Sequence, residues 1–204
     1  MTLKLITKPT SEPVTLAEAK AHLRVVNDAE DSLINGLITA AREYCEYYQN
    51  RAYITQTWEL WLDKWPEKNF IKIPKPPLQS VQSVKYYGID DTDDTEYTLD
   101  TEEYYIDDKS EPGRVSLAYN KSWPSVTLRP ISGICVTFTV GYLPAGEGEN
   151  EDPAGNVPQG VKQAILLLVG HWYENREASI IGHVSREIEF AAHALLWPER
   201  VVPI

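Results

Sequence analysis

The residues of this sequence that could do chemistry are four histidines and several groups of carboxylates. His171 is the strongest single candidate, because Glu174 follows it by one helical turn in the segment "HWYENRE". A carboxylate at that spacing could hold the imidazole as a general base. A nucleophile is missing nearby, since neither a G-x-S-x-G nor an H-E-x-x-H pattern occurs. We therefore favour a packed histidine and predict no catalytic residue.

A metal site would need a different arrangement of ligands. The acidic run "DDTDDTE", Asp90 to Glu96, lacks the alternating ligands, the sixth-position Gly and the twelfth-position Glu of a calcium loop. We interpret it as a solvated hairpin tip, with weak cation binding left open. Cys45 and Cys135 lack metal-ligand spacing and are predicted to be reduced core residues of a cytosolic protein. The sequence thus predicts neither a metal nor a cofactor.

Composition predicts a folded, soluble chain. Its 204 residues suit one domain or a closely joined pair, and 43% are hydrophobic against 24% charged. The net charge of −11, without a Lys/Arg cluster, disfavours ordinary nucleic-acid binding, although an acidic surface would let a duplex slide past. The N-terminus lacks a signal-peptide core, and the longest apolar run, Ala164 to Val169, is far shorter than the ~20 residues of a membrane span. We expect a cytoplasmic protein without membrane contact.

Two helices are predicted near the N-terminus. In "TLAE", Thr15 and Glu18 form a capping box, and the apolar spacing then continues to about Val26. A second helix follows "NDAED", whose acids suit the positive helix end. Its apolar stripe is Leu33, Ile34, Leu37, Ile38, Ala41, Tyr44, Cys45 and Tyr48. We expect the two helices to form an antiparallel hairpin.

From Tyr53 the apolar period changes to two, which predicts strands. In "TWELWLDKW", Trp58, Leu60 and Leu62 should share one face. The other predicted strands are Phe70 to Ile73, Val81 to Tyr87, Glu96 to Leu99, Tyr104 to Asp107, Arg114 to Tyr119 and Ile134 to Tyr142. Turn-forming segments separate them, so the middle of the chain is an antiparallel β unit.

The last part of the chain returns to helix. "LPAGEGENEDPAGNVP", Leu143 to Pro158, has almost no apolar content and predicts a mobile loop. A long helix over about Pro158 to Glu177 follows, then a shorter one around Arg186 to Leu196 that Pro198 ends. We predict an α+β fold, in which residues 1–54 and 157–204 form a helical base, 55–143 an inserted antiparallel β unit and 144–156 an acidic mobile loop.

The many aromatic residues suggest one possible function, that of a carbohydrate- or protein-binding module. Exposed rings on a β face could stack on sugars. The rings in or near predicted strands are Trp58, Trp61, Trp65, Tyr86, Tyr87, Tyr104 and Tyr105. Strand alternation buries half of such rings, so β core and subunit contact is the simpler interpretation. An enzyme is the third option.

Several segments, taken in order, resemble the head–tail connector (adaptor) proteins of tailed bacteriophages. They are "TLAEAKAHLRV", "EDSLINGLITAAREYCEYYQNRA", "TQTWELWLD", "PPLQSVQSVKYY", "VTFTVGY" and "VPQGVKQAILLLVGHWYENREA". Their order and spacing, over most of residues 13 to 178, carry the resemblance.

The resemblance implies a structural role without catalysis. Family members form a ring, typically about twelve copies, beneath the portal protein, where they extend the DNA channel and carry the stopper or tail-completion protein. It therefore implies a homododecameric virion neck protein, assembled in the host cytoplasm, with itself, the portal and the stopper as partners. Genomic DNA would only pass through during packaging and ejection, and the acidic excess should partly face its path.

The resemblance also suggests two contact surfaces. A helix as apolar as Ile165 to Val169 must be covered on nearly all sides, and ring neighbours could supply that cover. The ring-interface candidates, at the polar end of that helix, are His171, Trp172, Tyr173, Asn175 and Arg176.

The C-terminal segment from Arg186 onward is the predicted portal contact, because such segments dock on the portal in the family and its residues are apolar. The portal-contact candidates are Leu195, Leu196, Trp197, Arg200, Val201 and Val202. The alternative is that this segment folds back on its own helical base.

Overall fold

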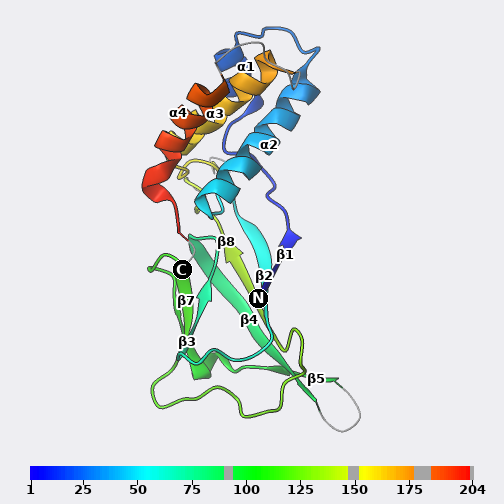
Figure 1. Cartoon of the computed structure of the whole chain (residues 1–204), viewed down its shortest axis with the longest axis vertical. Coiled ribbons are helices and arrows are strands. Elements are labelled where there is room, and N and C mark those ends of the chain that lie inside the picture. Colours follow the sequence, from blue (N-terminus) through cyan, green and yellow to red (C-terminus); the bar gives the residue numbers. More distant parts are fainter. Residues whose placement is uncertain (90–93, 147–151, 177–184, 203–204) are drawn as a thin grey trace. The chain divides into compact units, whose positions relative to one another are not determined.

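The computed structural model describes residues 1–89, 94–146, 152–176 and 185–202, with only the backbone at residue 94 and residues 185–189. The chain divides into two compact units, a β unit of residues 1–9 and 55–141 and a helical unit of residues 10–54 and 142–204 (Figure 1). The α+β class is confirmed. The prediction that the helical base begins at residue 1 is wrong, since residues 1–9 group with the β unit.

The β unit contains two antiparallel sheets (Figure 1). The larger sheet has the order β1-β2-β8-β4-β5, and the smaller has the order β3-β7-β6. The strands are β1 (Thr2–Thr7), β2 (Gln56–Leu62), β3 (Phe70–Ile73), β4 (Leu78–Ile89), β5 (Asp94–Thr98), β6 (Tyr104–Asp107), β7 (Gly113–Leu117) and β8 (Ile134–Val140). Each predicted strand is present, within a few residues at its ends.

Strand β1 was not predicted, although its sequence alternates. Leu3 and Leu5 are half-buried and pair with Leu60 and Trp58 of β2, while Lys4 faces solvent. Two apolar residues in a short terminal segment are a weak signal, because only the pairing with β2 buries them.

Strand β8 lies at the centre of the larger sheet, between β2 and β4. Every second residue of β8 is apolar and fully buried, namely Ile134, Val136, Phe138 and Val140. Strand β4 is longer than predicted. Two register shifts, between Leu78 and Ser80 and between Val81 and Ser83, interrupt the alternation of its side chains, so the sequence pattern did not show its full length.

The two sheets pack together where β7 meets β4. A Cβ atom at Gly113 would lie 2.7 Å from Cδ2 and 2.8 Å from Cβ of Leu78, so only glycine allows this approach. Ile71, Ile73 and Val115 of the smaller sheet are buried. The smaller sheet therefore covers part of one face of the larger one.

The helical unit contains α1 (Leu16–Leu23), α2 (Asp31–Gln49), α3 (Gln159–Glu174), α4 (Ser185–Leu196) and the short 3₁₀ helix η3 (Trp197–Glu199). The predicted capping box at the start of α1 is confirmed, since Thr15 and Glu18 exchange hydrogen bonds with each other's backbone N–H. The predicted extension of α1 to Val26 is wrong. Arg24 adopts a left-handed conformation with φ 59°, which ends the helix, and Val26 is 94% exposed.

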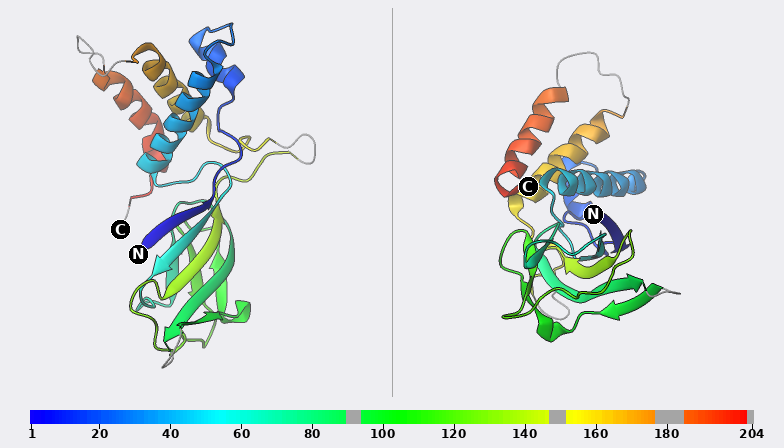
Figure 2. Two further views of the ribbon diagram at one scale, coloured as in Figure 1. Left: turned by 90° about the vertical axis from the view of Figure 1, so that its right-hand side faces the viewer. Right: turned by 60° about the horizontal axis from the view of Figure 1, so that its bottom comes forward.

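Helix α3 packs against α1, α2 and α4 in the core of the helical unit (Figure 2). Ala164, Ile165, Leu166, Leu168 and Val169 are buried within the single chain. Ring neighbours, which the sequence analysis suggested as a possible source of cover for this apolar helix, are therefore not needed to bury these five residues. The other helices of the same chain supply the cover.

The segment before α3 is more structured than its composition suggests. Ala145 and Asp152 exchange two backbone hydrogen bonds, and Ala154 and Val157 are buried in the helical core. The expectation that residues 143–158 cannot anchor a core is thus wrong for residues 152–158. The mobility predicted for residues 144–156 stays a prediction, and residues 147–151 lie outside the described residues.

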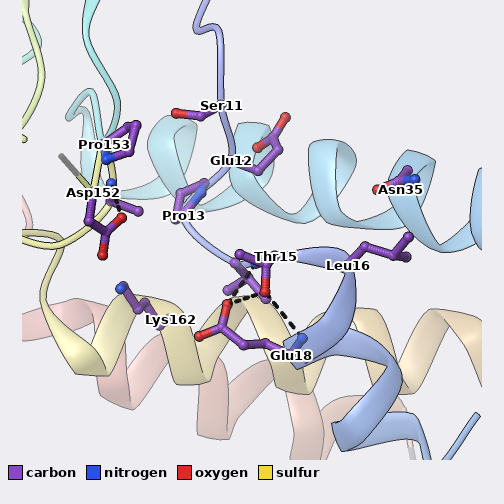
Figure 3. Close-up of a pocket in the computed structure, with 12 residues that line it drawn as sticks. Ser11, Glu12, Pro13, Thr15, Leu16, Glu18, Asn35, Asp152, Pro153 and Lys162 are labelled. Carbon is purple, nitrogen blue, oxygen red and sulfur yellow. Dashed lines mark hydrogen bonds between the residues drawn. The ribbon is translucent and has the colours of Figure 1, made fainter. Parts of the chain in front are cut away.

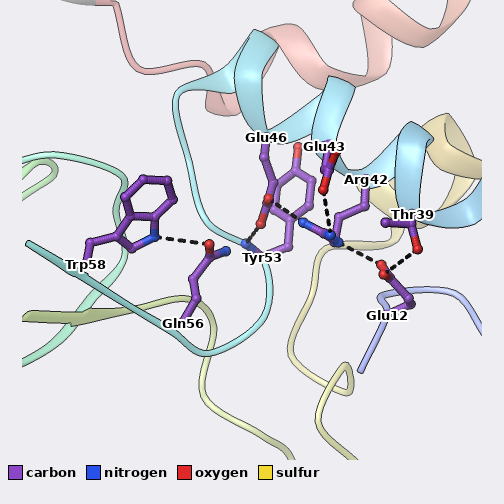
Figure 4. A network of polar contacts seen from close by, with 8 residues as sticks. All are labelled: Glu12, Thr39, Arg42, Glu43, Glu46, Tyr53, Gln56 and Trp58. Carbon is purple, nitrogen blue, oxygen red and sulfur yellow. Dashed lines mark hydrogen bonds and ion pairs between the residues drawn. The ribbon is translucent and has the colours of Figure 1, made fainter. Parts of the chain in front are cut away.

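A buried polar network lies on α2 (Figure 4). Arg42 is 5% exposed and donates through Nε to Glu12 and through Nη1 to Glu46, each at 2.7 Å. The second carboxylate oxygen of Glu46 accepts from the backbone N–H of Tyr53 at 2.8 Å. Glu12 also accepts from the Thr39 hydroxyl at 2.9 Å. The network therefore fixes the segments that precede α1 and follow α2.

We predict that Arg42→Met lowers the free energy of unfolding of the helical unit by about 3 kcal/mol, because it breaks two ion pairs of a buried guanidinium, those with Glu46 and Glu12. Chemical denaturation followed by the helical circular dichroism signal measures the change. Arg114→Met is the control, because Arg114 pairs with Asp107 at the surface of the β unit. Equal helical stability of both variants would contradict the prediction.

Candidate interaction surfaces

The chain after α4 folds back along the C-terminal end of α2. Gln49 donates through Nε2 to the carbonyl of Leu196, and its own carbonyl accepts from the backbone N–H of Val201 at 2.9 Å. Asn50 donates to the carbonyl of Val201 at 2.8 Å, and Arg51 donates to that of Glu199. Residues 196–201 thus fold back on the helical unit of their own chain, which was the alternative to a portal contact. Several of their side chains are still exposed in this conformation.

The six portal-contact candidates fall into three groups. Leu195, Trp197 and Val202 are exposed, with Trp197 at 61%. Arg200 and Val201 are half-buried. Leu196 is fully buried in the helical core, so its side chain is not available to a partner in this conformation. Phe190 of α4, at 74% exposure, is a further apolar side chain of this region that the sequence analysis did not name.

A cleft of about 330 Å³ lies between α2, α4 and the C-terminal segment. Its lining residues are Tyr44, Tyr47, Tyr48, Asn50, His193 and Arg200. The His193 ring is parallel to the Tyr48 ring, with centroids 4.2 Å apart, and its Nε2 is 2.8 Å from the Tyr44 hydroxyl. The Arg200 guanidinium lies over the Tyr48 ring, 4.7 Å from its centroid. The cleft thus joins aromatic walls to a cation.

The ring-interface candidates at the end of α3 are mostly engaged within the chain. His171 is buried, and Asn175 donates to its carbonyl at 2.9 Å and lies 3.1 Å from its Nδ1. Trp172 packs edge-on against Tyr44 at 6.1 Å between centroids. His171 therefore has the packed role that the sequence analysis favoured over a general base.

Tyr173 and Arg176 meet a carboxylate at the start of α2. Arg176 pairs with Glu30 at 2.7 Å, and the Tyr173 hydroxyl donates to the same carboxylate. These hydrogen bonds, first that from Arg176, hold the pKa of the Glu30 carboxyl below its usual range. Of the five ring-interface candidates, only Asn175 and Arg176 are exposed.

A second pocket, of about 350 Å³, lies at the start of α1 (Figure 3). The Glu18 carboxylate accepts from the Thr15 backbone N–H at 2.7 Å and from the Thr15 hydroxyl at 2.8 Å. The backbone hydrogen bond is the main reason that the pKa of Glu18 is lowered. Lys162 and Asp152 also line the pocket. The Glu18 carboxylate is already engaged in the capping box. We therefore interpret Glu18 as a residue that stabilises the start of α1.

The aromatic residues of the β unit mostly contact one another. Trp61 stacks with Tyr87, and Arg129 lies 4.1 Å from the Tyr87 ring centroid. Trp65 stacks with Trp123 at 4.7 Å between centroids. Tyr104, of the remaining rings, is buried and Tyr105 is 65% exposed. Rings that stack on one another in this way are typical of β packing, which is the interpretation favoured from the sequence.

The described residues offer no group of three or more His, Cys, Asp or Glu side chains that could hold a metal ion. Residues 90–93 of the acidic hairpin lie outside that part of the chain. Burial raises the pKa of the Cys45 thiol to about 12 and of the Cys135 thiol to about 11, so both stay protonated at neutral pH. Among the described residues, no helix has the length and apolar character that crossing a bilayer requires.

The sequence analysis named Arg200 but none of the other residues that line the cleft as part of a site, and it missed the residues that anchor the C-terminal segment. Tyr44 and Tyr48 are spaced as one helix face, which was visible, but their contact with His193 spans about 150 positions and has no local signal. Gln49 and Arg51 are polar residues that read as surface, yet they are 1% and 6% exposed.

The chain matches the family model described as phage gp6-like head-tail connector protein, over residues 13–102 and 133–197. It also matches chains of solved structures titled "Neck of empty GTA particle computed with C6 symmetry" and "Virion of native gene transfer agent (GTA) particle", each with a TM-score of 0.77 and 20% identity. A third, "Neck of native GTA particle computed with C12 symmetry", has a TM-score of 0.73 and 19% identity. Each match covers 100% of this chain and 97% of the other. None of the curated protein sequences matches significantly.

We predict that Leu196→Ala lowers the free energy of unfolding by about 2–5 kcal/mol, because it leaves a cavity in the helical core. Trp197→Ala should change it by less than about 1 kcal/mol, since the ring is largely exposed. Thermal unfolding of both variants, side by side, measures the difference. A large loss of stability in Trp197→Ala would show that this ring serves the fold and not a surface.

Proposed function

Because this chain belongs to the phage gp6-like head-tail connector family, we propose that it forms a ring in a virion neck, between the portal and the stopper or tail-completion protein. The observation that carries the proposal is the family match, which spans both structural units. The similarity in fold to chains of gene transfer agent particles, over the whole length, supports it.

A closed ring of about twelve copies is the proposed assembly. The neck of one similar structure was computed with C12 symmetry, which supports this copy number. Head-to-tail contacts close such a ring, so each copy must present two different surfaces. Asn175 and Arg176, exposed at the end of α3, remain candidates for one of them, with Trp172 and Tyr173 behind them.

The portal contact is proposed for the exposed side chains of the C-terminal segment. Leu195, Trp197 and Val202 present apolar area, with Val201 and Arg200 beside them, while Leu196 serves the core. Aromatic and arginine side chains are typical anchors of protein interfaces. The backbone hydrogen bonds of this segment to α2 would hold these side chains ready, so docking would order few residues.

The role is structural, without catalysis or cofactor, and DNA only passes through the ring. A channel extension works better when its acidic surface repels phosphate, and this chain carries 30 acidic against 19 basic residues. We expect assembly in the host cytoplasm and residence in the neck of the virion.

We predict that the protein joins its portal as a ring visible by negative-stain electron microscopy. The double variant Trp197→Ala with Val202→Ser should keep its melting temperature and lose portal binding, because it removes exposed apolar area and one of the two rings beside Arg200, while the buried core stays unchanged. Tyr105→Ala, which truncates an exposed ring of the β unit, is the control and should bind normally. Normal binding by the double variant would move the contact elsewhere in the helical unit.

We also predict that the isolated protein binds duplex DNA weakly, because no basic cluster neutralises a row of phosphates. Fluorescence anisotropy with a labelled duplex, measured at low and high salt, tests this. Tight binding that weakens steeply with salt would contradict an acidic channel surface.

A further inference from the structure

Arg200 is a half-buried arginine whose charge has no carboxylate partner among the described residues. Arg42, Arg114 and Arg176 each pair with a carboxylate. Arg200 makes no ion pair and no side-chain hydrogen bond with a described residue, and its Nε is fully covered without a partner. Its guanidinium lies over two rings, 4.7 Å from the centroid of Tyr48 and 5.6 Å from that of Trp197.

The surroundings of Arg200 leave its terminal nitrogens ready for an anion. Arg200 lines the aromatic cleft described above, and none of the six lining residues is acidic. The chain as a whole has a charge of −11, so a cationic cleft without a carboxylate stands out from its composition. An arginine stacked on aromatic rings is held in place, which favours planar, bidentate binding of a carboxylate.

The walls of the cleft add a second requirement for the ligand. Tyr47 is 82% exposed, and the Tyr48 and His193 rings lie parallel beside it, so the cleft offers flat apolar surface next to the cation. An acidic side chain that has an apolar residue beside it fits this surface better than a bare phosphate does, because the apolar residue can contact the rings. A single arginine is also a poor match for a duplex, which proteins bind through several cations.

We propose that this cleft is a recognition site for an acidic side chain, Asp or Glu beside an apolar residue, on the portal protein. Arg200 binds the carboxylate, and the rings of Tyr47 and Tyr48 contact the neighbouring apolar group. The inference rests on the proposed portal contact and names its chemistry.

Two dipeptides test the cleft without the portal. The Nε–Hε signal of Arg200, identified by its loss in Arg200→Lys, is followed by NMR during titration with N-acetyl-Phe-Glu-amide or with N-acetyl-Phe-Gln-amide. The Glu peptide should shift this signal saturably, and the neutral Gln peptide should bind roughly tenfold or more weakly. Equal shifts with both peptides, or a shift with a short DNA duplex only, would overturn the carboxylate assignment.

Portal binding is the second measurement, with folding checked by circular dichroism. Arg200→Glu should abolish portal binding and Arg200→Lys should weaken it, because lysine keeps the charge but not the planar fork. Arg114→Glu, at the surface of the β unit, is the control and should bind normally. If Arg200→Glu binds the portal as well as the wild-type protein does, the inference about the cleft is wrong, while the proposed portal contact is unaffected. Selective binding of the Glu peptide by a protein that does not join the portal would overturn the proposed function instead.

Discussion

The ion pair between Arg42 and Glu46 is the interaction on which the helical unit depends. This unit is discontinuous in sequence, since residues 10–54 and 142–204 form it together. Its separate segments must be tied to one element, and α2 is that element. Arg42 holds the entering segment through Glu12, and Glu46 holds the leaving one through the Tyr53 backbone. A buried pair is stabilising only when its hydrogen bonds are satisfied, and both carboxylate oxygens of Glu46 are.

The same end of α2 prepares the surface to which we assign partner binding. The side chains of Gln49, Asn50 and Arg51 donate hydrogen bonds to backbone carbonyls of residues 196–201. The segment therefore has a defined path without a long helix or strand of its own. These backbone hydrogen bonds position the exposed side chains of Trp197 and Val202. A partner could bind the two side chains without breaking the hydrogen bonds.

Local signals predicted most of the fold, and long-range contacts account for what was missed. The capping box at Thr15 and the alternation of β8 are properties of a few neighbouring residues, so the sequence alone was sufficient. Strand β1 and the cleft around His193 depend on partners more than fifty positions away. For the candidate surfaces, the resemblance and the apolar composition together led to the prediction of the C-terminal segment, but they could not separate Leu196, which is buried, from Trp197, which is exposed. That difference is decided by which face of the last helical turn meets α2 and α3.

The apolar helix α3 shows why interface and core are hard to separate in a sequence. The sequence analysis suggested neighbouring copies as a source of cover for this helix, yet α1, α2 and α4 provide it within one chain. A ring built from such copies would not need a core-like interface to complete each fold. Its contacts would then use surface residues with polar character, as exposed Asn175 and Arg176 have, and would resemble the interfaces of partners that fold before they assemble.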